Sequence, residues 1–172
     1  MLRRVPPVST PDDDLASFYE ATCPRLVRAL HAACGSRADA EEIAQDAYVR
    51  LLPRWDRVRR YEDPEGWVRS VAMRLLISRA RRAKVARLGL DRLGAQTPTS
   101  TLDSSALAVE QALAQLPVNQ RVVVVLHHLL DLPLEQVAAD LRIPPGTVKS
   151  RLARARTALK PLLSDDQEVR HA

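Results

Sequence analysis

The chain has 172 residues, with 26 lysines and arginines against 21 aspartates and glutamates, for a formal net charge of +5. This length suits one ordinary domain or two small ones, and the basic excess suits a polyanionic partner without identifying one. No apolar run approaches the roughly 20 residues of a membrane helix, and Cys23 and Cys34 make no C-x-x-C pair or disulfide framework. We therefore expect a cytoplasmic protein without a membrane segment.

Residues 1–14 contain three prolines and end in three successive aspartates, without the apolar core of a signal peptide. We expect a disordered leader there. From Leu15 to Ala33, apolar residues recur at steps of three and four, which predicts an amphipathic helix. Gly35 marks the end of that helix, because glycine is favoured just beyond a helix C-terminus.

A second helix is expected between Ser36 and Pro53. Ser36 and Asp39 have the spacing of a capping box, with aspartate in place of the usual glutamate. Apolar residues from Ala40 to Leu52 form one face of this helix. The opposite face is polar and mostly acidic.

The third predicted helix covers residues 64–85. The chain from Trp55 to Gly66 is polar, and Asp63-Pro64 is typical of a helix start. Apolar residues mark one side of this helix, and its C-terminal part is strongly basic.

Residues 89–106 are rich in glycine, proline, serine and threonine, which is the composition of a flexible linker. We place the domain boundary there. Residues 15–88 then form one small helical domain, residues 107–163 form a second, and residues 164–172 are a polar tail. The fold class expected is all-α, since no alternating strand pattern is evident.

Four helices are expected in the second domain, over residues 107–116, 119–130, 134–141 and 145–163. The valine run in the second of these could suggest a strand, but its neighbours are helical. A short helix, a four-residue turn and a longer basic helix are typical of a helix-turn-helix.

The last of these helices has the pattern of a recognition helix. Val148, Leu152 and Ala155 would hold it to the preceding helix, while polar residues near its N-terminus enter the major groove. Lysine and arginine can read guanine edges or neutralise phosphates, and serine and threonine can donate to phosphates. The polar candidates are Thr147, Lys149, Ser150, Arg151 and Arg154.

The segments 113–117, 132–138 and 143–152 together resemble region 4 of extracytoplasmic-function (ECF, group IV) sigma factors of the sigma-70 family. This resemblance implies binding to the promoter −35 element and to the flap of RNA polymerase. By residue match, Lys149, Ser150 and Arg154 are the candidates for −35 contacts. Arg151 is a candidate phosphate contact.

The stretch from Asp39 to Tyr48 resembles region 2.2 of the same family, which docks on the clamp coiled coil of the polymerase core. An outward acidic face is complementary in charge to a basic coiled coil. The residues expected to bind core are Asp39, Glu41, Glu42, Gln45 and Asp46.

Residues 66–82 resemble regions 2.3 and 2.4, which read and open the −10 element. Opening requires a pocket for an extruded base and a basic groove for the single strand. The candidates are Trp67, Arg74, Arg79, Arg81 and Arg82. The chain departs from the family pattern at Arg74, where asparagine is usual, at Ser78, where aspartate is frequent, and at Arg142, a position of the turn where glycine, asparagine or aspartate is common.

The resemblance implies a sigma factor that binds RNA polymerase core and directs promoter-specific initiation, with an anti-sigma factor as a possible further partner. The alternative is a helix-turn-helix regulator that acts without polymerase; the first domain argues against it. An enzyme is disfavoured, because the adjacent His127 and His128 point about 100° apart on a helix and no nucleophile or phosphate-loop motif is present. No metal or cofactor is expected.

Overall fold

The computed structural model describes residues 11–89 and 104–168, and all regular structure in these two ranges is helical. This confirms the all-α class. The first half contains α1 (Pro11–Cys34), α2 (Arg37–Leu51), the 3-10 turn η1 (Leu52–Arg54), α3 (Trp55–Val58) and α4 (Pro64–Gly89). The second half contains α5 (Ser104–Ala114), α6 (Val118–Val124), the π-helical turn η2 (Val125–Leu129), α7 (Leu134–Leu141) and α8 (Pro145–Glu168).

Several boundaries differ from the prediction. The leader expected for residues 1–14 is too long, because α1 already begins at Pro11; proline suits the first helical position, and acidic residues are favoured in the first turn by the helix dipole. Helix α5 begins at Ser104, within the expected linker, and residues 90–103 lie outside the described part of the chain. Helix α8 continues to Glu168, so part of the expected tail is helical.

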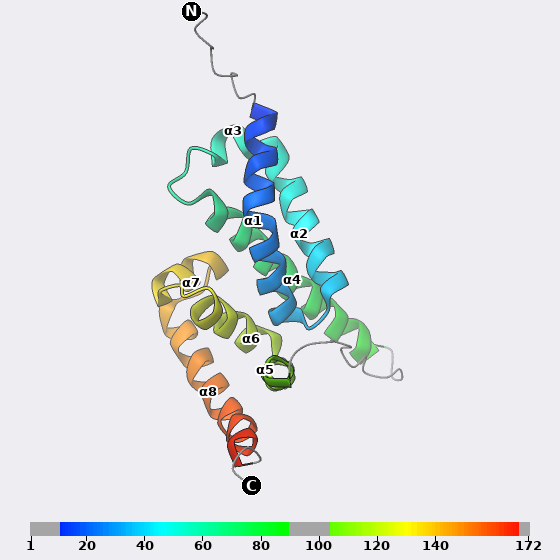
Figure 1. Ribbon diagram of the computed structural model, residues 1–172, viewed down its shortest axis with the longest axis vertical. Coiled ribbons are helices and arrows are strands. Elements are labelled where there is room, and N and C mark those ends of the chain that lie inside the picture. Colours follow the sequence, from blue (N-terminus) through cyan, green and yellow to red (C-terminus); the bar gives the residue numbers. More distant parts are fainter. Residues whose placement is uncertain (1–10, 90–103, 169–172) are drawn as a thin grey trace, which may run out of the picture.

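Small residues let α1 and α2 pack closely. Ala29, Ala33, Ala40, Ala44 and Ala47 are at most 1% exposed, and their small side chains favour a close approach of the two helices. Ser36 caps α2 as the spacing predicted, since its side chain accepts a hydrogen bond from the Asp39 amide at 3.2 Å. The antiparallel pair is visible in Figure 1.

An aromatic cluster closes the end of the first half near the start of α1. The ring of Phe18 lies 5.0 Å from that of Trp55 and 6.4 Å from that of Tyr48. The polar segment expected from Trp55 onward is therefore partly wrong: Trp55 and Val58 are buried and lie on the short helix α3. Leu52, expected on the apolar face of α2, is exposed because η1 begins there and turns the chain.

The turn between α7 and α8 has the geometry of a helix-turn-helix. Arg142 ends α7 in the left-handed conformation, with φ 56° and ψ 47°. The amide of Ile143 donates to the carbonyl of Ala138 at 3.0 Å, which satisfies one of the last carbonyls of α7. The left-handed conformation strains Arg142, since it costs a non-glycine residue about 1 kcal/mol.

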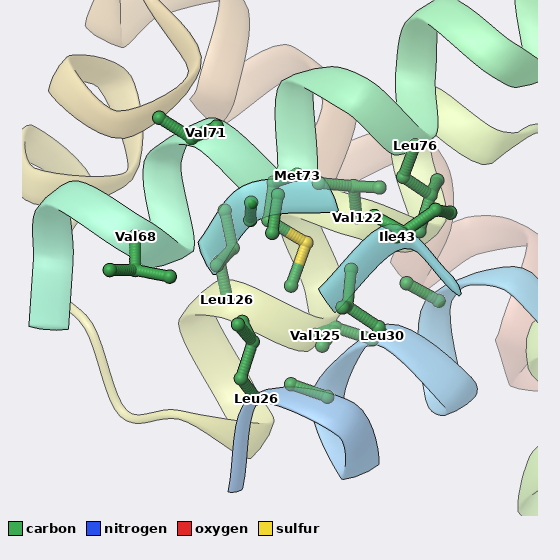
Figure 2. Packing of buried hydrophobic residues seen from close by; sticks show 14 of the residues in the cluster. Leu26, Leu30, Ile43, Val68, Val71, Met73, Leu76, Val122, Val125 and Leu126 are labelled. Atoms are coloured by element: carbon green, nitrogen blue, oxygen red, sulfur yellow. The ribbon is translucent and has the colours of Figure 1, made fainter. Parts of the chain in front are cut away.

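The two halves share one hydrophobic core. Val122, Val125 and Leu126 of the second half belong to the same buried cluster as Leu30 and Met73 of the first. Figure 2 shows these side chains gathered between α1, α4 and the α6–η2 segment. Helix α7 also packs on α4, and α5 and α6 pack on α1. The described structure is thus a closed arrangement, in which the domains inferred from the sequence lie against each other (Figure 1).

Candidate nucleic-acid interface and docking face

The N-terminal part of α8 has a buried side and a polar side, as predicted. Val148 and Ala155 are fully buried and hold α8 against the rest of the second half. Lys149, Ser150 and Arg154 are exposed on the other side. Two further candidates are less open: Thr147 and Arg151 are half-buried, and the backbone carbonyl of Thr147 accepts the hydroxyl of Ser150 at 3.0 Å.

The candidates for −10 contacts on α4 do not share one environment. Arg81 and Arg82 are exposed. Arg74 is half-buried, and burial, followed by the nearby charge of Arg142, lowers the pKa of its guanidinium. Trp67 packs against the hydrophobic core as a half-buried side chain, so its ring contributes at least partly to the fold.

Arg79 differs from the other α4 arginines because it is bonded to the acidic face of α2. Its guanidinium donates to Asp39 at 2.9 Å and to Glu42 at 2.8 Å. The hydrogen bond to Glu42 is the main reason why the pKa of Arg79 is raised. The structure therefore brings a predicted DNA contact together with two predicted core contacts.

The residues of α2 that were predicted to bind polymerase core face outward. Glu41, Glu42, Gln45 and Asp46 are exposed, and Asp39 is half-exposed. Arg37 pairs with Glu41 at 2.9 Å one turn along the helix, an exposed contact of small energetic weight. Asp39, Glu41, Glu42, Gln45 and Asp46 thus form one polar face, termed here the α2 acidic face.

A pocket of about 250 Å³ lies between α4 and the second half. Three arginines line it, Arg74 and Arg81 of α4 and Arg151 of α8. The closed arrangement thus places candidates from both predicted DNA-binding surfaces around one small cavity. The other lining residues are Ile77, Ser78, Asn119, Leu141 and Ile143.

An ion pair between the halves was not predicted from the sequence. Arg69 on α4 donates through Nε to Asp140 on α7 at 2.7 Å, and the two side chains are 8% and 4% exposed. One signal was present: Asp140 follows Val137 by three residues, so it belongs to the buried face of α7. A carboxylate at such a position requires a partner.

Asp63 and Gly66, at the start of α4, position the Arg69 side chain for this contact. The carboxylate of Asp63 accepts the Gly66 amide at 2.7 Å and the Arg69 Nη2 group at 3.3 Å. A Cβ atom on Gly66 would lie 2.6 Å from Asp63 Cγ and 2.9 Å from Arg69 Nη2. Glycine at this position therefore leaves room for the carboxylate and the guanidinium to meet.

Arg121 on α6 makes a second polar contact between the halves. Its guanidinium donates to the carbonyls of Ala33 at 3.2 Å, Ala114 at 2.9 Å and Leu116 at 3.0 Å. These carbonyls lie at the C-terminal ends of α1 and α5, where backbone acceptors lack helical partners. Burial lowers the pKa of the Arg121 guanidinium, and the nearby Cys34 opposes this effect.

His127 and His128, the adjacent histidines of η2, lie in surroundings that explain them as structural residues. Nδ1 of His127 lies 2.7 Å from the carbonyl of Leu132, and the pKa of His128 is lowered by burial, then by His127 and Arg156. Within residues 11–89 and 104–168, no group of three or more histidine, cysteine, aspartate or glutamate residues could hold a metal ion.

None of the helices in those ranges is both long and apolar enough to span a bilayer.

Comparisons with known proteins match both halves. Residues 18–85 match the family model described as Sigma-70 region 2, and residues 106–159 match the one described as Sigma-70, region 4. The ECF RNA polymerase sigma factor SigW of Bacillus subtilis is 28% identical, with 95% of this chain and 96% of SigW covered. The RNA polymerase sigma-E factor of Streptomyces avermitilis is 30% identical, with 84% of this chain and 83% of that protein covered.

The chain spans 58% and 54% of the length of two longer mycobacterial relatives. Among solved structures, the sigma factor RpoE in complex with the anti-sigma factor NepR from Bartonella quintana has a TM-score of 0.72 at 22% identity. That alignment covers 88% of this chain and 97% of the other. At this identity the likeness shows a shared fold.

Proposed function

The chain belongs to the ECF sigma factors of the sigma-70 family, and we propose that it binds RNA polymerase core through its first half and places the polymerase on promoters through both halves. The observation that carries the proposal is the presence, in one chain, of an exposed acidic α2 face and an exposed polar start of α8. A helix-turn-helix regulator that ignores polymerase would need only the second. The role is that of an initiation factor without catalysis, and group IV is the branch that the resemblance implies.

Contacts to the −35 element are assigned to the open side of α8. Lys149 and Arg154 can donate to guanine edges or phosphates, and Ser150 can donate to a phosphate. Thr147 and Arg151 join them once the half-buried side of α8 is uncovered. The second half would also supply the surface that meets the polymerase flap.

Contacts to the −10 element are assigned to the basic end of α4. Arg81 and Arg82 are open to a single strand, whose affinity rests on backbone neutralisation. Arg74 joins them from the pocket between the halves, and Trp67 supplies the ring nearest the start of the helix. Arg79 is a weaker candidate for a −10 contact, because its guanidinium is already bonded to Asp39 and Glu42.

Docking on the core clamp coiled coil is assigned to the α2 acidic face. Exposed carboxylates at Glu41, Glu42 and Asp46 offer a charge pattern that steers association with a basic surface and fixes its register. The RpoE structure contains an anti-sigma factor, and a regulator of that kind is a further proposed partner of this chain. A cytoplasmic location fits both partners.

Two pairs of substitutions test whether α8 contacts the −35 element and the α2 acidic face binds polymerase core. Lys149→Ala with Arg154→Ala should lower −35-dependent transcription by tenfold or more, on the order of 1–3 kcal/mol per lost base contact, while core binding stays intact. Glu42→Lys with Asp46→Lys should weaken core binding by about tenfold. If both pairs reduce core binding equally, or if neither affects it, the assignment of the two faces is wrong.

A further inference from the structure

The pocket between α4 and the second half is lined by arginines whose charge the protein does not balance. Arg74 and Arg81 of α4 and Arg151 of α8 line it. In the described part of the chain, none of these three side chains forms an ion pair or a hydrogen bond. Two other arginines of α4 differ, since Arg69 and Arg79 are each bonded to two carboxylates. The pocket therefore has an excess of positive charge.

The surroundings of Arg74 show the same excess. Burial, followed by the nearby charge of Arg142, lowers the pKa of the Arg74 guanidinium. The charge of Asp140 opposes this effect. However, both carboxylate oxygens of Asp140 are already bonded, one to Arg69 Nε at 2.7 Å and the other to Gln136 Nε2 at 2.7 Å. A further negative charge in the pocket would favour the charged form of Arg74.

The polar residues of the lining also suit an anion. Ser78 of α4 and Asn119 of α6 are exposed, and their hydroxyl and amide groups can donate hydrogen bonds to an oxyanion. Among the described residues that line the pocket, none is a carboxylate. The family pattern frequently has aspartate at position 78 and usually has asparagine at position 74. Serine and arginine at these two positions make the pocket of this chain more positive than that pattern would.

The size and the charge of the pocket together define a class of ligand. Its volume of about 250 Å³ lies below the roughly 300–1,000 Å³ of sites for drug-sized molecules, so it suits a small ion. The planar guanidinium group matches two oxygens of a phosphate with parallel hydrogen bonds. A multivalent phosphate also offsets several arginine charges at once. Pyrophosphate combines a high negative charge with a small volume.

We propose that this pocket binds a free phosphate anion, of the size of inorganic phosphate or pyrophosphate, through Arg74, Arg81 and Arg151. Nucleic-acid backbones offer the same chemistry, but each of their phosphates carries one charge and is flanked by sugars. A free anion matches the pocket better, because it is smaller than a nucleotide and carries more charge. The proposal goes beyond the proposed function, since the chain alone binds the anion, without polymerase or promoter.

Two matched pairs of substitutions test the site in the full chain. Ser78→Asp places a carboxylate at the pocket, and Ser78→Asn is its control, because asparagine has the same shape without the charge. Arg74→Asn removes one lining charge, and Arg57→Asn makes the same change at an exposed arginine of α3 that does not line the pocket. Because Ser78 is exposed, both of its variants are expected to fold. Far-UV circular dichroism verifies the fold of all four variants.

Isothermal titration calorimetry at constant ionic strength measures the binding of pyrophosphate, of inorganic phosphate and, separately, of a short single-stranded oligonucleotide. We expect saturable binding of one pyrophosphate per chain and weaker binding of phosphate, which carries less charge. Ser78→Asp should weaken pyrophosphate binding by about tenfold or more relative to Ser78→Asn, because one like charge is added at close range. Arg74→Asn should weaken it in the same way, and Arg57→Asn should leave it unchanged.

Three results would overturn the proposal. Without saturable binding of either free anion, the pocket is only a gap in the packing. Equal pyrophosphate affinities in the two Ser78 variants, or in Arg74→Asn and Arg57→Asn, would mean that the pocket does not determine binding. If only the oligonucleotide binds and responds to Ser78→Asp, the arginines serve nucleic-acid phosphates instead. A failure of the chain to bind polymerase core would count against the proposed function and leave the calorimetric result unaffected.

Discussion

Arg79 on α4 donates to Glu42 on α2 at 2.8 Å, and this bond joins the basic end of one predicted surface to the acidic face of another. Asp39 accepts from the same guanidinium at 2.9 Å. The two contacts bind the Arg79 guanidinium to the α2 acidic face in the free chain. Arg81 and Arg82, which belong to the same basic cluster in the sequence, are exposed instead.

Arg79→Ala should therefore affect −10 binding less than Arg82→Ala. Each phosphate contact to single-stranded DNA adds about 0.7 to the slope of log affinity against log salt. We expect Arg82→Ala to lower this slope by about that amount for the core-bound protein, and Arg79→Ala to leave it close to the wild-type value. The measurement is a salt titration of binding to single-stranded promoter DNA. Equal loss in both variants would show that Arg79 leaves its carboxylates to contact DNA.

Gly66→Ala should destabilise the first half and loosen the contact between Arg69 and Asp140. Because the new methyl group would meet Asp63 Cγ at 2.6 Å and Arg69 Nη2 at 2.9 Å, one of these groups has to move. We expect a loss of about 1 kcal/mol in the free energy of unfolding, because the Asp63 carboxylate has to give up the hydrogen bond with which it caps the start of α4. Urea denaturation followed by circular dichroism measures it.

Gly146→Ala is the matched control for that substitution. A Cβ atom on Gly146 would meet nothing within 4 Å, and the residue lies in the first turn of α8. Removing a glycine from a helix stabilises by about 0.5–1 kcal/mol when the site has room. Similar losses in both variants would show that crowding at Asp63 and Arg69 is not the cause.

Arg142→Gly should stabilise the chain, because the left-handed conformation at φ 56° is strained for arginine and free of strain for glycine. The gain is limited by the greater entropy of glycine in the unfolded chain, so we expect a net increase of about 0.5 kcal/mol in the free energy of unfolding. Ala139→Gly, at an exposed helical position three residues earlier, should instead cost about 1 kcal/mol. The prediction fails if both substitutions destabilise.

Alkaline pH should weaken the fold through Tyr48. Burial raises the pKa of Tyr48 to about 12, against the opposing effect of its hydrogen bond with Thr22. In the unfolded chain a tyrosine loses its proton near pH 10, so between about pH 10 and 12 the unfolded state binds fewer protons and stability falls as pH rises. Tyr48→Phe should make this fall shallower in urea titrations, and Tyr61→Phe, a change at an exposed ring, should not.

Local patterns predicted the elements that depend on neighbouring residues. Ser36 caps α2, and the turn at Arg142 connects α7 to α8 as the spacing indicated. The exposure of Lys149 and Arg154 followed from the helical positions of Val148 and Leu152. In each case the relevant interaction lies within a few residues of chain, which is the range that helical periodicity reports.

Contacts between distant segments were missed. Trp55 is buried because Phe18 of α1 lies 5.0 Å from its ring, and nothing near Trp55 in the sequence indicates that partner. Likewise, Asp140 alone indicates a need for a buried counter-charge but not that Arg69 supplies it. The closed arrangement depends on such pairs, so periodicity could give the two halves but not their packing.

The most direct test of the central claim is the binding of the purified chain to bacterial RNA polymerase core, followed by transcription from genomic promoter fragments. The account predicts a stable complex and new transcripts that require the chain, both reduced by Glu42→Lys with Asp46→Lys, with only the transcripts reduced by Lys149→Ala with Arg154→Ala. Sequence-specific binding to duplex DNA by the chain alone, without any complex with core, would contradict it and would identify a helix-turn-helix regulator instead.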